Sequence, residues 1–246
     1  MYLILCSAMD ASAQWAARGL GDLLPGPLEL VLAETLAEGA TWEHRVEEDA
    51  THLKVTLADG RVLCGSRIKG VVNRLMAPTP ARTQWPSETE QAYVHGEIHA
   101  FYLSWLHGLP CVMINRPSPT CLDGRFFRVS EWLYRATKTG LKIAPYRQTD
   151  DDGGDGYSLP VPEGAVRHSV VVAGSCVFPA WMPATVKAGC VQLAKDTGLE
   201  LMGADLYMDE GGEWCFAGAS SSPDLMAGDT PLLDQIAAML QRGGGR

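Results

Sequence analysis

The sequence predicts an α/β fold that shades into α+β. Short apolar runs alternate with helical patterns through the first half of the chain, whereas hairpin patterns dominate the second half. Of the 246 residues, 46% are hydrophobic, which is typical of a globular protein. A chain of this length forms one large domain or two small ones.

The first half contains apolar runs that we expect to be strands, at residues 2–6, 28–33, 69–75 and 111–115. After the first run, Ser12 is a candidate N-cap for a helix that ends at Leu-Pro-Gly, residues 24–26. Residues 52–57 and 61–64 alternate between apolar and polar around Asp59-Gly60, which predicts a hairpin.

The clearest helix follows Ser87. Ser87 and Glu90 form a capping-box pattern, and Gly108 with Pro110 ends the helix. Apolar residues recur at spacings of three and four, so we expect one buried face made of Val94, Ile98, Phe101, Trp105 and Leu109.

The second half predicts two helices, two hairpins and a last helix. These are a helix at 130–138 closed by Gly140, a hairpin of 166–173 and 176–180, a helix from Pro183 to Gly198, a hairpin turning at 210–212, and a helix from Thr230 to Gln241.

Charge and composition exclude several classes of protein. The net charge of −9 argues against nonspecific binding to nucleic acid or to an anionic membrane. No apolar run reaches the length of a transmembrane helix, and the first residues read as a strand rather than a signal peptide. Seven scattered cysteines without a C-x-x-C pair are typical of buried thiols in a reducing compartment, so we expect a cytoplasmic protein.

Several short motifs occur in an order that is typical of one enzyme family. They are Val71-Val72-Asn73-Arg74, Ile114-Asn115-Arg116-Pro117, Gly140 to Pro145, Val166-Arg167 through Gly174, and Gly203-Ala204-Asp205. With this order the chain resembles the ATP-grasp ligases of the RimK and glutathione-synthetase type over nearly its whole length. The resemblance implies an ATP-grasp-like fold, with a pre-grasp α/β domain at 1–117 and a truncated grasp domain at 118–241. The last residues, 242–246, have the sequence RGGGR, from which we expect a disordered tail.

Two departures from the family suggest lost chemistry. In the family, a lid that carries two phosphate-binding lysines follows the segment matched by Pro145, whereas this chain has no lysine between Lys142 and Lys187. The family's last strand also ends in a Glu-x-Asn pair that holds magnesium on ATP. The matching positions here are Gly218 and Ser220, which supply no anionic oxygen for a hard cation.

The resemblance and the residue types together indicate candidate binding residues. Arg74 and Arg116 follow apolar strand runs, and Arg167 opens a strand that faces substrate or phosphate in the family. Their planar forks suit a carboxylate or phosphate, and we expect them, with Asp205, to line a cleft between the two halves. The alternative is that these arginines are surface ion-pair partners.

A different kind of site is suggested by His95 and His99. Their spacing of four residues places both on one helix face, as metal-binding pairs require, although the pattern is not H-E-x-x-H. The alternative is that both flank an apolar stripe, and we expect no resident metal.

The sequence therefore favours a non-catalytic or minimal ATP-grasp-like protein, a pseudo-ligase without a cofactor. It would bind a peptide or amino-acid substrate, or pair with an active ATP-grasp ligase or a second copy of itself, in a peptide-modifying or small-molecule biosynthetic pathway. The first alternative is an active ATP-dependent carboxylate–amine ligase of RimK-like type, which would use ATP and magnesium. The second is a metal-dependent enzyme built on the helix of His95 and His99.

Overall fold

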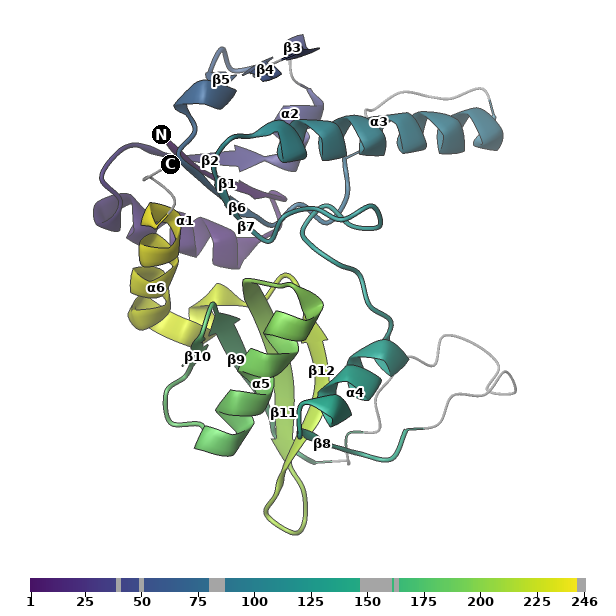
Figure 1. Ribbon diagram of the computed structural model, residues 1–246, viewed down its shortest axis with the longest axis vertical. Coiled ribbons are helices and arrows are strands. Elements are labelled where there is room, and N and C mark those ends of the chain that lie inside the picture. The colour runs from purple at the N-terminus through teal and green to yellow at the C-terminus, as the bar shows by residue number, and fades with distance from the viewer. Residues whose placement is uncertain (39–40, 49–50, 80–86, 147–160, 162–163, 243–246) are drawn as a thin grey trace. The chain divides into compact units, whose positions relative to one another are not determined.

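The chain forms two compact units, shown as a computed structural model in Figure 1. The first comprises Met1–Arg125 and Leu233–Arg246, and the second comprises Phe126–Leu232. The structure describes residues 1–38, 41–48, 51–79, 87–146, 161 and 164–242. The segment that replaces the expected lid lies mostly outside these residues, as does nearly all of the expected tail.

A parallel four-stranded sheet organises the first unit, in the order β2-β1-β6-β7. The strands are β1 (Tyr2–Cys6), β2 (Leu28–Leu32), β6 (Gly70–Asn73) and β7 (Val112–Ile114), close to the predicted apolar runs. Helix α1 (Ala11–Leu23) joins β1 to β2. Its N-cap is Asp10 rather than Ser12, because the Asp10 carboxylate accepts the N–H of Ala13.

A second, three-stranded antiparallel sheet covers part of this unit, in the order β3-β4-β5. The strands β4 (Thr51–Thr56) and β5 (Val62–Cys64) form the predicted hairpin, whereas β3 (Thr41–Val46) is an additional strand. The short helices α2 (Ala33–Ala37) and η1 (Gly65–Arg67) flank this sheet in sequence.

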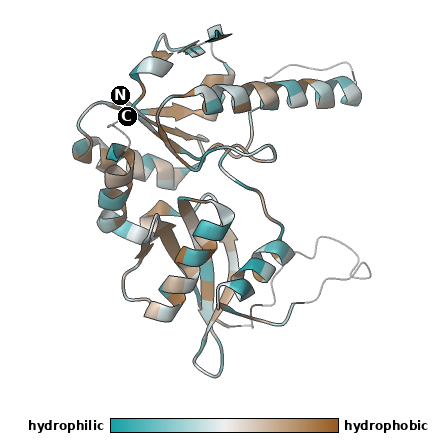
Figure 2. Cartoon of the chain, viewed as in Figure 1, coloured by the Kyte–Doolittle hydropathy of each residue, from teal (hydrophilic) through white to brown (hydrophobic). Residues whose placement is uncertain are grey.

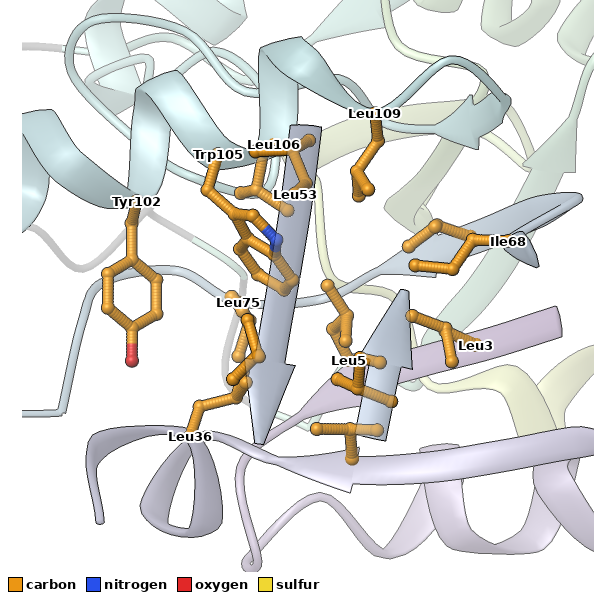
Figure 3. Close-up of a cluster of buried hydrophobic side chains, with 14 of the residues drawn as sticks. Leu3, Leu5, Leu36, Leu53, Ile68, Leu75, Tyr102, Trp105, Leu106 and Leu109 are labelled. Carbon is orange, nitrogen blue, oxygen red and sulfur yellow. The ribbon is translucent and has the colours of Figure 1, made fainter. Parts of the chain in front are cut away.

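The long helix α3 (Glu88–Gly108) packs on the sheets through its C-terminal half. The Ser87 cap is confirmed, since its hydroxyl accepts the N–H of Glu90. Figure 3 shows Tyr102, Trp105 and Leu106 facing the apolar side chains of the sheets. Val94, which we expected to be buried, is only half-buried, and so are Ile98 and Phe101.

The last helix, α6 (Asp229–Gln241), joins the first unit rather than the second from Leu233 onward. Its Leu233 lies against Gly19 of α1, and its Leu240 lies against Gly70 of β6. The compact units therefore differ from the predicted domains in two ways: the division falls after Arg125, and the C-terminal helix returns to the N-terminal core.

The second unit is a five-stranded sheet with helices on one face, in the order β10-β9-β11-β12-β8. The predicted helices and hairpins are present as α4 (Val129–Lys138), β9 (Arg167–Ala173), β10 (Cys176–Phe178), α5 (Ala184–Thr197), β11 (Leu201–Met208) and β12 (Trp214–Ser220). The unit also contains the short strand β8 (Lys142–Ile143) and, after β12, the 3₁₀ helix η2 (Leu225–Gly228). Side chains of α4 and α5, including Trp132 and Leu193, pack on Val170, Met202 and Phe216 of the sheet.

Hydropathy follows this architecture. In Figure 2 the strands β1, β2 and β6 are strongly hydrophobic, whereas the exposed sides of α3 and α5 carry hydrophilic residues. Within the described ranges, no helix combines the length and the apolar character needed to cross a membrane.

Candidate functional site

The face of the second sheet that is turned away from α4 and α5 carries small and polar side chains. Asp205 on β11 is paired with Ser169 on β9 and with Gly218 on β12. One row further along, Gly203 is paired with Ser220. Because paired residues share a face, these five positions gather on one side of the sheet, which is called the open face below.

A β-bulge brings Gly218 and Ser220 to the open face. The register of β11 and β12 shifts between Asp205 and Leu206, so that Leu206 is paired with Phe216 and both pack under the helices. Strict alternation along β12 would have placed Gly218 and Ser220 on the same side as Phe216. The bulge reverses this, as bulges beside binding sites commonly do.

A pocket of about 250 Å³ lies on the open face. Its polar lining consists of the carboxylates of Asp205 and Asp224 and the hydroxyls of Ser169, Ser220 and Ser222. Within the described part of the chain, none of the residues that line it is lysine, arginine or histidine. The pocket therefore offers hydrogen-bond acceptors and negative charge.

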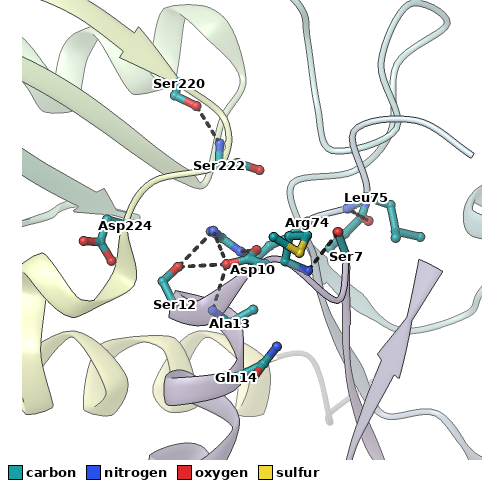
Figure 4. A network of polar contacts seen from close by, with 12 residues as sticks. Ser7, Asp10, Ser12, Ala13, Gln14, Arg74, Leu75, Ser220, Ser222 and Asp224 are labelled. Carbon is teal, nitrogen blue, oxygen red and sulfur yellow. Dashed lines mark hydrogen bonds and ion pairs between the residues drawn. The ribbon is translucent and has the colours of Figure 1, made fainter. Parts of the chain in front are cut away.

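Local hydrogen bonds hold these side chains in place. The hydroxyl of Ser169 donates to Oδ1 of Asp205 at 2.6 Å. The N–H of Ser222 donates to Oγ of Ser220 at 3.0 Å, on the turn after β12 shown in Figure 4. Asp224 caps η2 by accepting the N–H of Met226 at 3.0 Å. Hydrogen bonds to neighbouring residues therefore fix the polar side chains of the lining, both on the sheet and on the turn after β12.

Of the predicted binding residues, Arg167 and Asp205 come together in the second unit. Arg167 is exposed and paired with Tyr207, two residues along β11 from Asp205 and on the same face. It does not line the pocket itself. The sequence analysis did not identify Ser169. Its position two residues after Arg167 on a predicted strand could have indicated it, because residues two apart on a strand lie on the same face.

Lys142 is engaged elsewhere. Its ammonium donates to Asp209 at 2.6 Å and also to Glu213, which ties β8 to the hairpin of β11 and β12. The hydrogen bond to Asp209 is the main reason that the pKa of Lys142 is raised and that of Asp209 is lowered. The ammonium of Lys142 is therefore occupied by ion pairs with Asp209 and Glu213.

In the first unit, the guanidinium of Arg74 is already paired. Arg74 follows β6, as predicted, but its guanidinium donates to Asp10 from Nε at 2.7 Å and from Nη2 at 3.2 Å. Nη2 also donates to Oγ of Ser12 at 3.1 Å (Figure 4). The Arg74 side chain is 4% exposed, and its Nη1 is buried without a hydrogen-bond partner.

Arg116 follows β7 and remains on the surface. Its Nη2 donates to the carbonyl of Cys111 at 2.8 Å. Arg74 and Arg116 therefore follow neighbouring parallel strands, yet each points to a different partner. Among the described residues, the contacts of Arg74 and Arg116 do not bring the two side chains to a common partner.

The histidine pair lines an apolar pocket of about 210 Å³ with Ala77, Pro78 and Ile98. Nε2 of His95 is buried there without a hydrogen-bond partner. Across the described part of the chain, no three His, Cys, Asp or Glu residues are grouped as a metal would require. The thiol of Cys121, which lies further along the same unit, donates to Asp123.

Comparison with known proteins identifies the fold. No protein-family model matches the sequence, and no curated protein matches it either. Among solved structures, macrocyclase MdnC of Microcystis aeruginosa MRC, bound with precursor peptide MdnA, covers 99% of this chain and 100% of its own, with a TM-score of 0.72 and 11% identity. The likeness therefore extends over the whole chain, and structures described as ATP-grasp ligases match it equally well. The chain has an ATP-grasp-like fold, as the sequence motifs implied.

Two further structures agree along almost the whole chain. ATP-grasp ligase PsnB, complexed with minimal precursor, Mg and ADP, has a TM-score of 0.70, 14% identity and 98% coverage of both chains. A RiPP-associated ATP-grasp ligase of Chryseobacterium gregarium, with ADP and a leader and core peptide, has a TM-score of 0.69 and 12% identity, covering 97% of this chain and 96% of its own. At such low identity the likeness establishes the fold alone.

The residues on β12 differ from the Glu-x-Asn magnesium ligands that the family resemblance implies. Gly218 has no side-chain oxygen, and the Ser220 hydroxyl is a neutral ligand that already accepts a hydrogen bond. Only Asp205 supplies an anionic oxygen from the paired positions of β11 and β12 that share the open face. Magnesium on a nucleotide is usually held by one or two carboxylates together with the phosphates, so these paired positions supply only part of the ligand set that the resemblance implies.

Proposed function

We propose that this chain is a non-catalytic ATP-grasp-like protein that binds a peptide in a peptide-modifying pathway. The observation that carries the proposal is the pairing of Asp205 with Gly218, where the resemblance puts a glutamate. The solved structures of this fold that contain precursor peptides support the choice of a peptide as the ligand. We place the protein in the cytoplasm, beside an active ligase or a second copy of itself.

The physical reason for lost catalysis is electrostatic. Transfer of a phosphoryl group depends on metal ions and cationic side chains that neutralise the developing charge. The described lining of the pocket on the open face has two carboxylates and no cationic residue. It would therefore repel the negative charges of a triphosphate that are not neutralised by a bound metal ion. Arg167 is the nearest cation placed by the strand pairing, and we propose that it contacts an acidic group of the bound peptide.

Two measurements on the full chain test this proposal. Calorimetry with Mg-ATP should give no saturable binding with a dissociation constant below about 100 µM, which corresponds to about −5.5 kcal/mol. Selection from a displayed random-peptide library should enrich sequences that bind the folded protein. Saturable Mg-ATP binding would contradict the non-catalytic assignment, and a library without enrichment would contradict the peptide ligand.

An active ATP-dependent carboxylate–amine ligase is the alternative, and the full-length likeness to structures that hold ADP and Mg favours it. It predicts that Mg-ATP raises the melting temperature, because a ligand of the native state stabilises that state. It also predicts that ADP forms when an acceptor peptide is present. A chain that shows neither effect with its selected peptide is not such a ligase.

A further inference from the structure

The pocket on the open face is built to receive positive charge. Among the residues that the structure describes, Asp205 and Asp224 are the charged residues in its lining, and they come from different elements, β11 and the turn before η2. Three serine hydroxyls share the lining with them. Carboxylates and hydroxyls all accept hydrogen bonds, so the matching ligand is a cation that carries several N–H donors.

The size of the pocket favours an organic cation over a bare metal ion. Its volume of about 250 Å³ is several times the roughly 30 Å³ that one water molecule occupies in the liquid. A magnesium ion demands near-ideal octahedral geometry with short oxygen contacts. The two carboxylates are instead each committed to a local hydrogen bond, Asp205 with Ser169 and Asp224 with Met226.

The pocket wall also has an apolar part. Val171 and Pro223 line it, and both are buried residues of the surrounding fold. Lysine and arginine side chains combine an apolar stem with a charged head, and the stem commonly packs on apolar surface. A wall of this composition therefore suits a long cationic side chain better than a small free amine.

We propose that this pocket binds the cationic head of a lysine or arginine residue in the peptide ligand. The inference rests on the proposed peptide-binding function and names the side chain that the peptide presents. The ammonium or guanidinium takes the place of a metal ion near Asp205 and donates to Asp205, Asp224 and the serine hydroxyls. Arg167, one residue pair further along the open face, then disfavours a second cation beside the first.

The test compares charged and uncharged side chains of similar length on the full-length protein. The probes are acetyl-Gly-Lys-Gly-amide, acetyl-Gly-Arg-Gly-amide and acetyl-Gly-norleucine-Gly-amide, titrated to about 10 mM and followed by NMR shifts and by melting temperature. We expect the better of the two charged probes to bind at least about fivefold more tightly than the norleucine probe, because charge-assisted hydrogen bonds are the stronger ones. Comparison of the lysine probe with the arginine probe shows whether the pocket prefers an ammonium or a guanidinium group.

Two variants locate the binding. Asp205→Asn and Asp224→Asn keep the size of each side chain and its capacity to accept a hydrogen bond, so the fold should persist. Each should weaken the charged probe at least about fivefold and leave the norleucine probe unchanged. The control is Glu210→Gln, which removes the same charge from the exposed turn between β11 and β12 and should change neither probe.

Three results with the tripeptide probes and Mg²⁺ would overturn the inference. These are equal binding of the charged and norleucine probes, no binding of either charged probe, or saturable Mg²⁺ binding that Asp205→Asn abolishes. The proposed function fails separately, through Mg-ATP binding or through a peptide library without enrichment. Library-selected peptides that bind without lysine or arginine would leave peptide binding standing and remove only the cation pocket.

Discussion

Asp205 lies directly opposite Gly218 in the pairing of β11 with β12, immediately beside the bulge that reverses the direction of the β12 side chains. The carboxylate therefore has no charged neighbour across this strand pair. Instead it accepts the hydroxyl proton of Ser169 from the other side at 2.6 Å. A single residue change at Gly218 would alter the charge of this face without touching the hydrophobic core.

We predict that Gly218→Glu creates a divalent-cation site. Two carboxylates directly opposite each other repel, so the variant should be less stable than the native chain in the absence of metal. With a dissociation constant near 1 mM, about 10 mM Mg²⁺ should restore about 1.4 kcal/mol, or about 3–5 °C in melting temperature. Gly218→Gln, which has the same length without the charge, should show no such dependence on Mg²⁺. An equal response of both variants would contradict this account.

The order of the elements could be predicted because each carries local signals. The Ser87 cap is such a signal for α3, and Gly198 ends α5 in the left-handed conformation that glycine favours. The apolar stripe of α3 was predicted to be buried along its length, but its N-terminal half is only half-buried, as at Val94 and Ile98. The spacing of apolar residues shows which side of a helix is apolar. It does not show how far along the helix the packed sheets extend.

The candidate site could be predicted only in part, because it depends on long-range pairing. The motif positions identified Asp205, Gly218 and Ser220, but alternation along β12 would have put Gly218 on the helix-covered face. Gly218 inside a strand pattern is a weak signal for a bulge, but it does not fix where the register shifts. Likewise, nothing near Arg74 indicates Asp10, which lies 64 residues away and occupies the guanidinium.

We predict that Arg74→Ala destabilises the protein by about 3 kcal/mol, because removing one partner of a buried ion pair leaves the other without compensation. This expectation follows from the 4% exposure of the Arg74 side chain and its two contacts with Asp10. Chemical denaturation measures the change. Arg116→Ala is the matched control, since Arg116 is exposed, and it should change stability by less than about 0.5 kcal/mol. Similar losses of stability for the two variants would contradict a specific contribution of the buried ion pair.

The same ion pair predicts a dependence of stability on pH. Burial alone would raise the pKa of Asp10, but the hydrogen bond and charge of Arg74, with the Ala13 N–H and the Ser12 hydroxyl, lower it overall. The stabilisation is therefore fully present above the unfolded pKa, at about pH 4, and is lost as the pH falls through the lower folded value.

Asp10→Asn tests this dependence, because asparagine is also a good N-cap and keeps α1 capped. The difference in unfolding free energy between the native chain and the variant should be largest above about pH 5 and should shrink below about pH 4. A difference that does not vary with pH would mean that the charge of Asp10 is unimportant. Asp59 and Asp209, whose pKa values are also lowered, are present in both proteins and cancel in the comparison.

We predict that Trp105→Ala costs about 3–5 kcal/mol in chemical denaturation, as large-to-small aromatic changes in a core do. Trp105 is 2% exposed, and its ring meets Trp42 edge-on at 5.2 Å between centroids. Tyr93→Ala on the same helix is the control, because Tyr93 is 68% exposed and should contribute less than about 0.5 kcal/mol. A loss below about 1 kcal/mol for Trp105→Ala would mean that α3 is not anchored through this ring.

The cysteines should differ sharply in their reactivity toward a thiol reagent. Burial raises the pKa of Cys6, Cys121 and Cys190 to about 12, so at about pH 8 almost none of these thiols is in the reactive thiolate form. Cys64 and Cys176 are half-buried and free. After a short exposure of the native protein to N-ethylmaleimide, peptide mapping should find Cys64 and Cys176 modified well before the buried three.

In denaturant all of them should react at similar rates, because the difference comes from burial and not from the local sequence. Rapid modification of Cys190 in the native protein would show that the core under α5 opens far more readily than its packing implies.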